Sequence, residues 1–215
     1  MRSPRTALSR RIHWALVSIA LAAVGVAAGR SEAVTVQVTV DTSAFNGTPA
    51  SLSWDLTDGD PGASTTAIIT GFSTNGSFDA SQATSVGGVS GSLPGPVTIT
   101  DTDFFNSLLQ PVTLGTSVSF TLNMTTAASG QGVPDTLAFL LLTEDGLASL
   151  VATDLLGDAL LTLEADGTPG GLLLVAGATE PSVPVSATRT TAIPAPAALL
   201  LLAAALLPAL LVARR

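Results

Sequence analysis

The feature that most constrains this chain is an unbroken apolar run near its C-terminus, residues 197–213, followed by Arg214 and Arg215. At 1.5 Å per residue such a run makes a helix of about 25 Å, enough to cross a bilayer core of about 30 Å with local thinning. The two arginines predict a cytoplasmic end for this transmembrane helix. We therefore expect the chain upstream of it to be exported and held at a membrane.

The N-terminus has the three parts of a secretory signal peptide, which we predict over residues 1–33. Residues 14–28 form an apolar segment, and Ser31-Glu32-Ala33 offers a small-x-small site with cleavage after Ala33. The basic region that precedes them consists of Arg2, Arg5, Arg10 and Arg11. A twin-arginine signal is the alternative, but His13 and Trp14 stand where that signal has apolar residues.

Nearly all charged residues of the exported part are acidic. Of the 8 basic residues in the chain, only Arg189 lies between the predicted cut and the apolar run, and that region has no lysine. Nucleic-acid binding needs Lys and Arg to displace counterions from phosphates, so the charge excludes this class of partner. The chain has no cysteine, and its one histidine, His13, leaves with the signal peptide. Thiolate, Ser-His-Asp and His-bearing zinc chemistry are therefore excluded.

Short alternating segments separated by turns fill residues 34–182. Residues 34–40 alternate strictly, and residues 51–56 place Leu52, Trp54 and Leu56 on one face. Further strands are expected over residues 67–72, 77–80, 86–93, 97–100, 117–125, 137–142, 148–151, 159–165 and 172–175. This spacing predicts an all-β fold, an antiparallel β-sandwich of jelly-roll type.

Two segments depart from this pattern. Residues 103–110 predict one short helix that Asp101 or Thr102 caps, with Phe104 and Leu108 facing inward and Pro111 ending it. Residues 183–193, rich in Pro, Ser and Thr, predict an extended linker that lifts the domain off the membrane.

The C-terminal layout resembles a PEP-CTERM sorting signal, the tag processed by exosortases in Gram-negative bacteria. The sorting motif is Pro194-Ala195-Pro196, followed by the apolar run and by Arg214 and Arg215. Family members have Glu where this chain has Ala195. The resemblance implies exosortase and signal peptidase as processing enzymes. It also implies export across the inner membrane, membrane anchoring, and then a place at the cell surface or outside it. A plain membrane anchor is the alternative.

The exported body is also similar to a group of PEP-CTERM proteins whose mature part opens Val-Thr-Val-Asp-Thr-Ser. The matching segments are residues 38–43, 91–95, 104–106 with 108–110, and 166–167 with 169–171. The similarity spans about residues 34–175 and consists of turn and core residues. It implies a surface protein of bacteria that make extracellular matrix and carries no catalytic residues over.

Candidate ligands are carboxylates. Asp55, Asp58 and Asp60 could form a calcium site, since hard cations take carboxylate and carbonyl oxygens, but the same residues suit a polar turn. Asp101 and Asp103 are a second pair that also fits helix capping. A glycosidase would need two such acids in one cleft, and no pair stands out along the chain. Trp54 is expected in the core rather than in a sugar site.

We therefore expect a non-enzymatic surface or matrix protein without a required cofactor, in contact with extracellular polysaccharide. The alternatives are a carbohydrate- or calcium-binding module and, third, a carboxylate-dependent glycoside hydrolase. A calcium titration separates the second from the first, because a ligand specific for the native state raises its melting temperature.

Overall fold

The fold is described from a computed structural model, for residues 32–59, 65–126, 133–153, 157–165, 172–179 and 181–191. These residues belong to one compact unit that begins at Glu32. The fold is all-β and antiparallel, as the sequence predicts. Within these ranges the only helical elements are two 3-10 turns, η1 (Ser43–Phe45) and η2 (Ala80–Gln82). Among the same residues, none forms a helix of the length and hydrophobicity that a membrane crossing requires.

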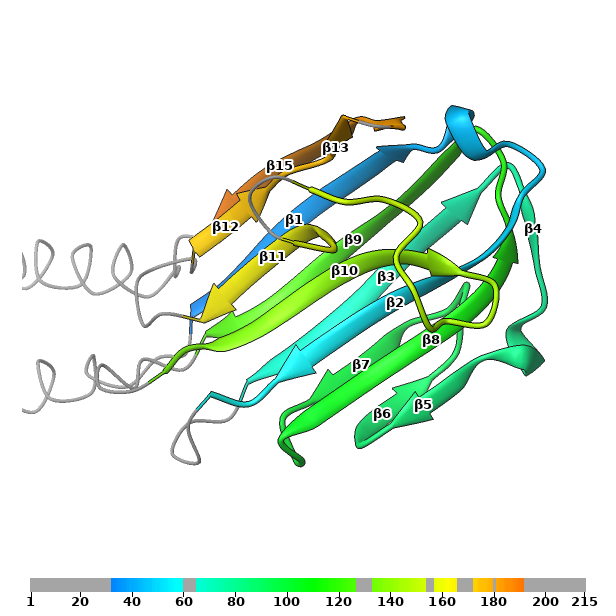
Figure 1. The fold of residues 1–215 in the computed structure, drawn as a ribbon. Coiled ribbons are helices and arrows are strands. Elements are labelled where there is room, and N and C mark those ends of the chain that lie inside the picture. The colour runs from blue at the N-terminus through cyan, green and yellow to red at the C-terminus, as the bar shows by residue number, and fades with distance from the viewer. Residues whose placement is uncertain are drawn as a thin grey trace, which may run out of the picture. The chain divides into compact units, whose positions relative to one another are not determined.

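One sheet has six strands in the order β15-β1-β9-β3-β7-β6 (Figure 1). The predicted strand at residues 34–40 is its second member, and Val34, Val36, Val38 and Val40 all point into the core. The segment predicted as a strand over residues 86–93 contributes β6, which is at one edge of this sheet. The strand bounds are β1 (Glu32–Asp41), β3 (Thr66–Thr74), β6 (Gly88–Gly91), β7 (Val97–Thr100), β9 (Ser117–Thr126) and β15 (Val185–Thr191).

The other sheet has seven strands in the order β12-β11-β10-β2-β8-β4, and β5 also pairs with β8. Its strands are β2 (Pro49–Thr57), β4 (Ser77–Phe78), β5 (Thr84–Val86), β8 (Phe105–Thr113), β10 (Asp135–Thr143), β11 (Ala159–Ala165) and β12 (Leu172–Val175). A small hairpin of β13 (Ala178–Thr179) and β14 (Ser182–Val183) leads into β15.

The two sheets share one apolar core, with aromatic side chains at its centre. Trp54 of β2 contacts Phe139 of its own sheet at 5.2 Å between ring centroids. It also packs edge-on against Phe72 and Phe120 of the six-stranded sheet, at 6.1 and 5.4 Å. Leu52 and Leu56 are buried on the same face of β2, as the alternation predicts. These rings join the sheets, because edge-to-face packing adds to the area that they bury.

The strand registers define two ends of the sandwich. Val34 pairs with Thr191, so the first and the last described strands meet at one end, which we call the proximal end. The same end holds Thr57, Phe105 and Leu172, which lie in one cross-strand row with Thr136 and Glu164. The opposite, distal end holds Asp41 with Ser117 and Pro49 with Thr113. In Figure 1 the proximal end is on the left.

The helix predicted over residues 103–110 is wrong, because the segment from Phe105 forms strand β8. β8 pairs along its whole length with β2, and Leu108 and Gln110 face the core beside Trp54 and Leu52. Pro111 lies where the pairing of β8 changes from β5 to β4, a break at which a residue without an N–H is tolerated. A two-turn helix has little stability of its own, so the segment forms the paired strand instead.

The linker predicted over residues 183–193 is also corrected, since residues 185–191 form strand β15. Val185 and Ala187 pack against the core, while Ser186, Thr188 and Thr190 are exposed, which is the alternation of a sheet edge. Pro184 still separates β14 from β15, and its carbonyl accepts a hydrogen bond from the Asp41 N–H at 2.9 Å. The strand predicted at residues 148–151 is reduced to one isolated bridge between Leu142 and Ser149.

Several sequence predictions fall outside the described residues. These are the signal peptide up to Ser31, Asp60, the sorting motif at residues 194–196, the apolar run, and Arg214 with Arg215. The predicted cleavage position, Ala33, is the second residue of β1 and pairs with Thr125 of β9. Cleavage there stays a prediction.

Candidate functional site

Of the residues predicted to bind calcium, the two that the structure describes, Asp55 and Asp58, lie on different faces of the strand β2 and its continuation. Asp55 is on the outer face of the seven-stranded sheet, where its Oδ1 accepts hydrogen bonds of 2.6 Å from the hydroxyls of Ser53 and Ser107. Asp58 follows the strand by one residue, and its N–H donates to the Phe104 carbonyl at 3.0 Å. Side chains three positions apart on an extended chain point to opposite faces. Among the described residues, no group of three or more metal-ligating side chains occurs.

The serines around Asp55 are not arranged as a nucleophile with its base. Both hydroxyls donate to the same carboxylate oxygen, and their own oxygens lie 3.4 Å apart. Nucleophilic activation of a serine needs a base such as an imidazole beside the hydroxyl, and the only histidine of the chain is His13. In this cluster the buried hydroxyls of Ser53 and Ser107 are therefore hydrogen-bonded to Asp55 on the outer face of the sheet.

Asp101 and Asp103 lie in the loop between β7 and β8, at the proximal end. The Asp101 carboxylate accepts the Thr65 N–H, and so ties the end of β7 to the residue that precedes β3. Asp103 donates and accepts through its backbone only, to and from the side chain of Asn106. The predicted capping role is thus a turn role, and no helix follows.

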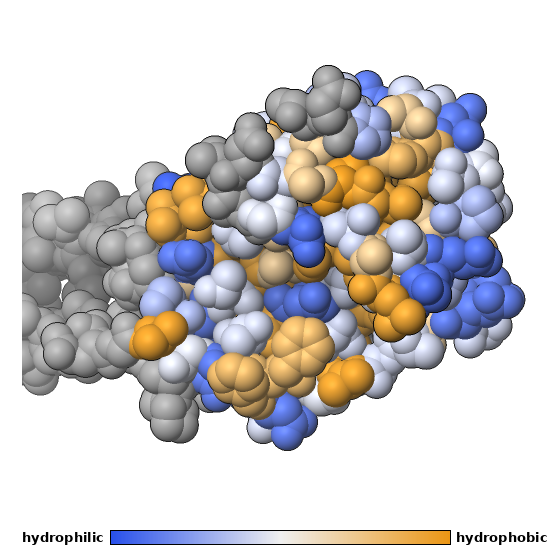
Figure 2. All heavy atoms as spheres, in the orientation of Figure 1, coloured by the Kyte–Doolittle hydropathy of each residue, from blue (hydrophilic) through white to orange (hydrophobic). Residues whose placement is uncertain are grey.

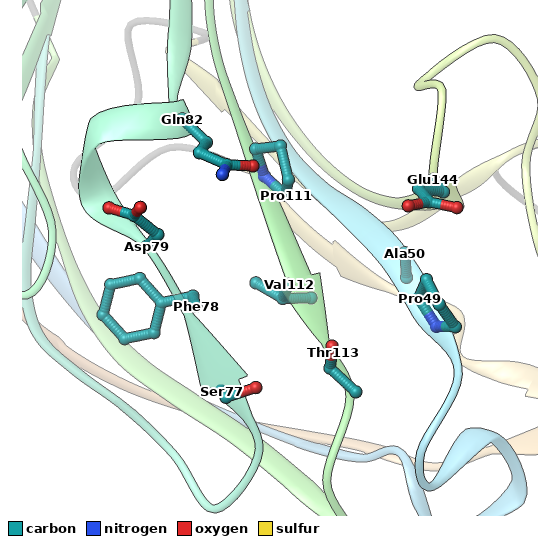
Figure 3. Close-up of a pocket in the computed structure, with 10 residues that line it drawn as sticks. All are labelled: Pro49, Ala50, Ser77, Phe78, Asp79, Gln82, Pro111, Val112, Thr113 and Glu144. Carbon is teal, nitrogen blue, oxygen red and sulfur yellow. The ribbon is translucent and has the colours of Figure 1, made fainter.

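Sequence reasoning missed a hollow of about 410 Å³ at the distal end, which we call the distal hollow (Figure 3). Its floor consists of the ends of β2 and β8, where Pro49 pairs with Thr113 and lies near Pro111 and Val112. One wall is the β4–η2 segment and the other is the segment that follows β10, which contributes Glu144. The side chains of the first wall are Ser77, Phe78, Asp79 and Gln82.

Hydrogen bonds hold both walls of the distal hollow in place. The Asp79 Oδ1 caps η2 by accepting the Ser81 N–H at 2.9 Å and the Ser81 hydroxyl at 2.7 Å. The buried Gln110 Nε2 donates to the Asp79 carbonyl at 3.0 Å from below. On the other side, the Ser51 hydroxyl donates to the Glu144 carbonyl at 3.0 Å. The shape therefore rests on rigid strands and tied turns.

The distal hollow is acidic. Asp79 and Glu144 stand on opposite walls, and no basic side chain lines the hollow. The hydroxyl and N–H of Ser81 lower the pKa of Asp79, so this carboxylate is ionised at neutral pH. The chemistry of the hollow favours contact with a cation or with a polar, hydroxyl-bearing ligand.

A sequence signal for part of the hollow does exist. Asp79-Ala80-Ser81 and Asp41-Thr42-Ser43 share an Asp-Xaa-Ser pattern, and in both the Asp carboxylate accepts the N–H of the serine two residues on. Nothing in the sequence, however, brings Asp79 toward Glu144, because that approach requires β2, β8 and β10 to be neighbours. Comparison of the chain with protein-family models, with curated proteins and with solved structures finds no match.

Proposed function

We propose that this protein is a non-catalytic, exported β-sandwich that its C-terminal segment holds at a membrane and displays on the outer side. The observation that carries the proposal is the pairing of Val34 with Thr191. Both chain ends leave the domain at its proximal end, and five residues separate Thr191 from the apolar run that begins at Ala197. A domain tethered in this way presents its distal end, with the hollow, to the surroundings.

We infer a jelly-roll arrangement, in which β1-β9-β3-β7 face β2-β8-β4 across the core, with β15 and β10 to β12 as additions. In this proposal signal peptidase removes the leader after Ala33. An exosortase then acts at Pro194-Ala195-Pro196, and the released or displayed domain lies against extracellular polysaccharide.

Intact-mass analysis of the protein from the surface and membrane fractions of its native host tests the proposal. We expect an N-terminus at residue 34 and, for the processed form, a C-terminus near Pro194. A retained Arg215 in the membrane fraction would favour the plain anchor over sorting. A folded cytosolic form that keeps its first thirty residues would contradict export altogether.

A ligand-binding module is the second candidate, and the distal hollow is the observation that favours it. Two carboxylates on opposite walls suit a calcium ion bridged by water or a polar glycan. Calcium titration followed by melting temperature tests the first ligand, and a Glu144→Gln variant is the control. A rise that this variant abolishes supports binding at the hollow, whereas a rise that it leaves unchanged places the ion elsewhere.

A further inference from the structure

Exposed apolar side chains are unevenly distributed along the sandwich. Among the described residues, seven large apolar side chains are exposed, and only Leu147 is near the distal end. The other six, which we call the proximal apolar rim, are Val86, Phe104, Phe105, Val133, Leu172 and Leu174. Phe104 and Val133 are 75% and 66% exposed, so the rim is open rather than part of the core.

The strand registers place four members of the rim on one face at one end. Phe105 and Leu172 are the two ends of the first cross-strand row of the seven-stranded sheet. Val86 and Leu174 are the two ends of the next row on that face, which runs through Ser107, Asp55, Ala138 and Thr162. The two rows lie about 7 Å apart along the strands. Figure 2 looks onto this face and shows apolar surface over β12 and beside the start of β8.

We propose that the proximal apolar rim docks on the surface of the lipid bilayer to which the chain is tethered. This inference rests on the proposed function, because it takes the apolar run at residues 197–213 as the anchor. Thr191 ends β15 at the proximal end, and the six residues to Ala197 span at most about 20 Å when fully extended. The rim is therefore confined beside the membrane rather than exposed to bulk solvent.

The geometry of the rim suits the interface between headgroups and acyl chains. Peripheral apolar faces enter that region by about 5 to 10 Å, which matches the separation of the two rows. Exposed apolar surface gathered at one end of a protein commonly marks a membrane or protein contact, and here it lies at the two sides of the row, with Thr57, Thr136 and Glu164 between Phe105 and Leu172. Docking through the outer face of the seven-stranded sheet would also fix the tilt of the domain, and so the direction in which the distal hollow points.

Charge decides which lipids the rim accepts. Glu164 stands within the first row, and Asp101 and Asp103 precede Phe104, while the exported part has no lysine to meet lipid phosphates. The docking must therefore be apolar in origin. Anionic lipids would repel the carboxylates, and this repulsion weakens as salt screens it. A second copy of the chain is a poor alternative occupant, since two acidic bodies repel each other.

The absence of cysteine allows a direct test with single spin labels on the full chain in phosphatidylcholine vesicles. Thr102→Cys places a nitroxide beside the rim, and Ala44→Cys places one in η1 at the distal end; both positions are exposed. We expect the ratio of collisions with oxygen to collisions with a water-soluble nickel reagent to be several-fold higher at position 102. Equal, aqueous ratios at the two positions would overturn the inference.

Variants separate the rim from general hydrophobicity. Phe104→Ser with Phe105→Ser should return the label at position 102 to an aqueous ratio, whereas Leu147→Ser, which is 85% exposed but distal, should leave it unchanged. If the phenylalanine pair prevents a cooperative melt, Leu172→Ser with Leu174→Ser tests the other end of the same rim and should lower the ratio. In phosphatidylglycerol vesicles at low salt we expect a lower ratio than in phosphatidylcholine, and a higher one would contradict apolar docking.

Flotation distinguishes the two levels of the proposal. If the full chain does not float with the vesicles, the membrane anchor itself fails. If it floats but position 102 is aqueous, only the docking inference fails. If position 102 is protected in native membranes but not in pure lipid, a protein covers the rim, and that result also overturns lipid docking.

Discussion

Both faces of strand β2 carry buried side chains, but different interactions stabilise the two faces. On the inner face, Leu52, Trp54 and Leu56 are buried among other apolar side chains of both sheets. On the outer face, Ser51 and Ser53 are equally buried, but they are satisfied by the Glu144 carbonyl and by Asp55. Neighbouring residues 54 and 55 thus belong to two environments. One is stabilised by the area removed from water and the other by the pairing of polar groups.

The two faces should therefore tolerate different substitutions. Loss of volume on the inner face leaves a cavity between rigid sheets, so its cost grows with the size of the group removed. Loss of one hydroxyl on the outer face leaves a carboxylate that can still reach a second donor.

The largest effect is expected for Trp54→Ala, which removes the ring at the centre of the aromatic cluster. We expect the free energy of unfolding to fall by about 3–5 kcal/mol, the usual range for a buried aromatic truncated to alanine. Urea denaturation followed by far-UV circular dichroism measures it. Trp54→Phe should cost much less, because it keeps one ring and removes an indole N–H that is buried without a hydrogen-bond partner. Equal losses in the two variants would contradict a cavity origin.

Asn106, like Gln110, is a fully buried polar residue on the core-facing side of β8. Its Oδ1 accepts the Gly88 N–H at 2.7 Å, and its Nδ2 donates to the Asp103 carbonyl at 2.6 Å. Asn106→Leu should lower the free energy of unfolding by about 2–3 kcal/mol, since buried backbone groups lose their partners. Asn106→Asp should cost at least as much at neutral pH, because a buried carboxylate would face the Leu56 and Asp103 carbonyls to which the Asn106 Nδ2 now donates. A stabilised leucine variant would show that apolar burial governs this site too.

On the outer face, Ser53→Ala and Ser107→Ala each remove one donor to Asp55. We expect a loss of about 1 kcal/mol from either variant, typical of one hydrogen bond to a charged or neutral partner. The double variant should lose more than the sum, because the carboxylate then has neither hydroxyl. Thermal or urea melts of the four chains give the coupling energy. Strict additivity would mean that the two serines act independently of Asp55.

The smallest effect concerns three exposed turns. Hydrogen bonds from Ser43, Ser81 and Thr143 lower the pKa values of Asp41, Asp79 and Asp145 respectively. A carboxyl group with a lowered folded-state pKa stabilises the fold above its unfolded pKa of about 3.9, and this contribution is lost as pH falls through the folded pKa. We expect a modest drop in melting temperature below about pH 4. The drop should be smaller in the Asp79→Asn variant.

Asp41→Asn is the matched control for that measurement. It interrupts the same Asp-Xaa-Ser turn, also at the distal end, but outside the hollow. In both variants the melting temperature should fall less, and by a similar amount, as the pH is lowered below about 4. Only Asp79→Asn should alter binding of a cation at the hollow, so a shared loss of binding would assign the effect to turn stability.

Much of the fold could be predicted, because period-two alternation reports directly on which side chains face a core. Residues 34–40, 51–56 and 117–125 behave as expected in β1, β2 and β9. The error at residues 103–110 has a clear cause. Phe104 and Leu108 are four residues apart, which suits one helix face, but a two-turn helix has little stability of its own and the exposed edge of β2 offered nine paired residues instead. The predicted linker is wrong at residues 185–191 for a similar reason, since Thr and Ser suit both a linker and an edge strand.

The sequence by itself determined the all-β class, the acidic charge, the apolar ends and the residues of the inner faces, because composition and alternation are local properties of the chain. Only the tertiary structure decided that Val34 meets Thr191, that Asp79 and Glu144 line one hollow, and that six exposed apolar residues gather at the proximal end. Each of these juxtapositions depends on strand order and register. Strand order is settled by the packing of distant segments around a common core, and no local pattern encodes it.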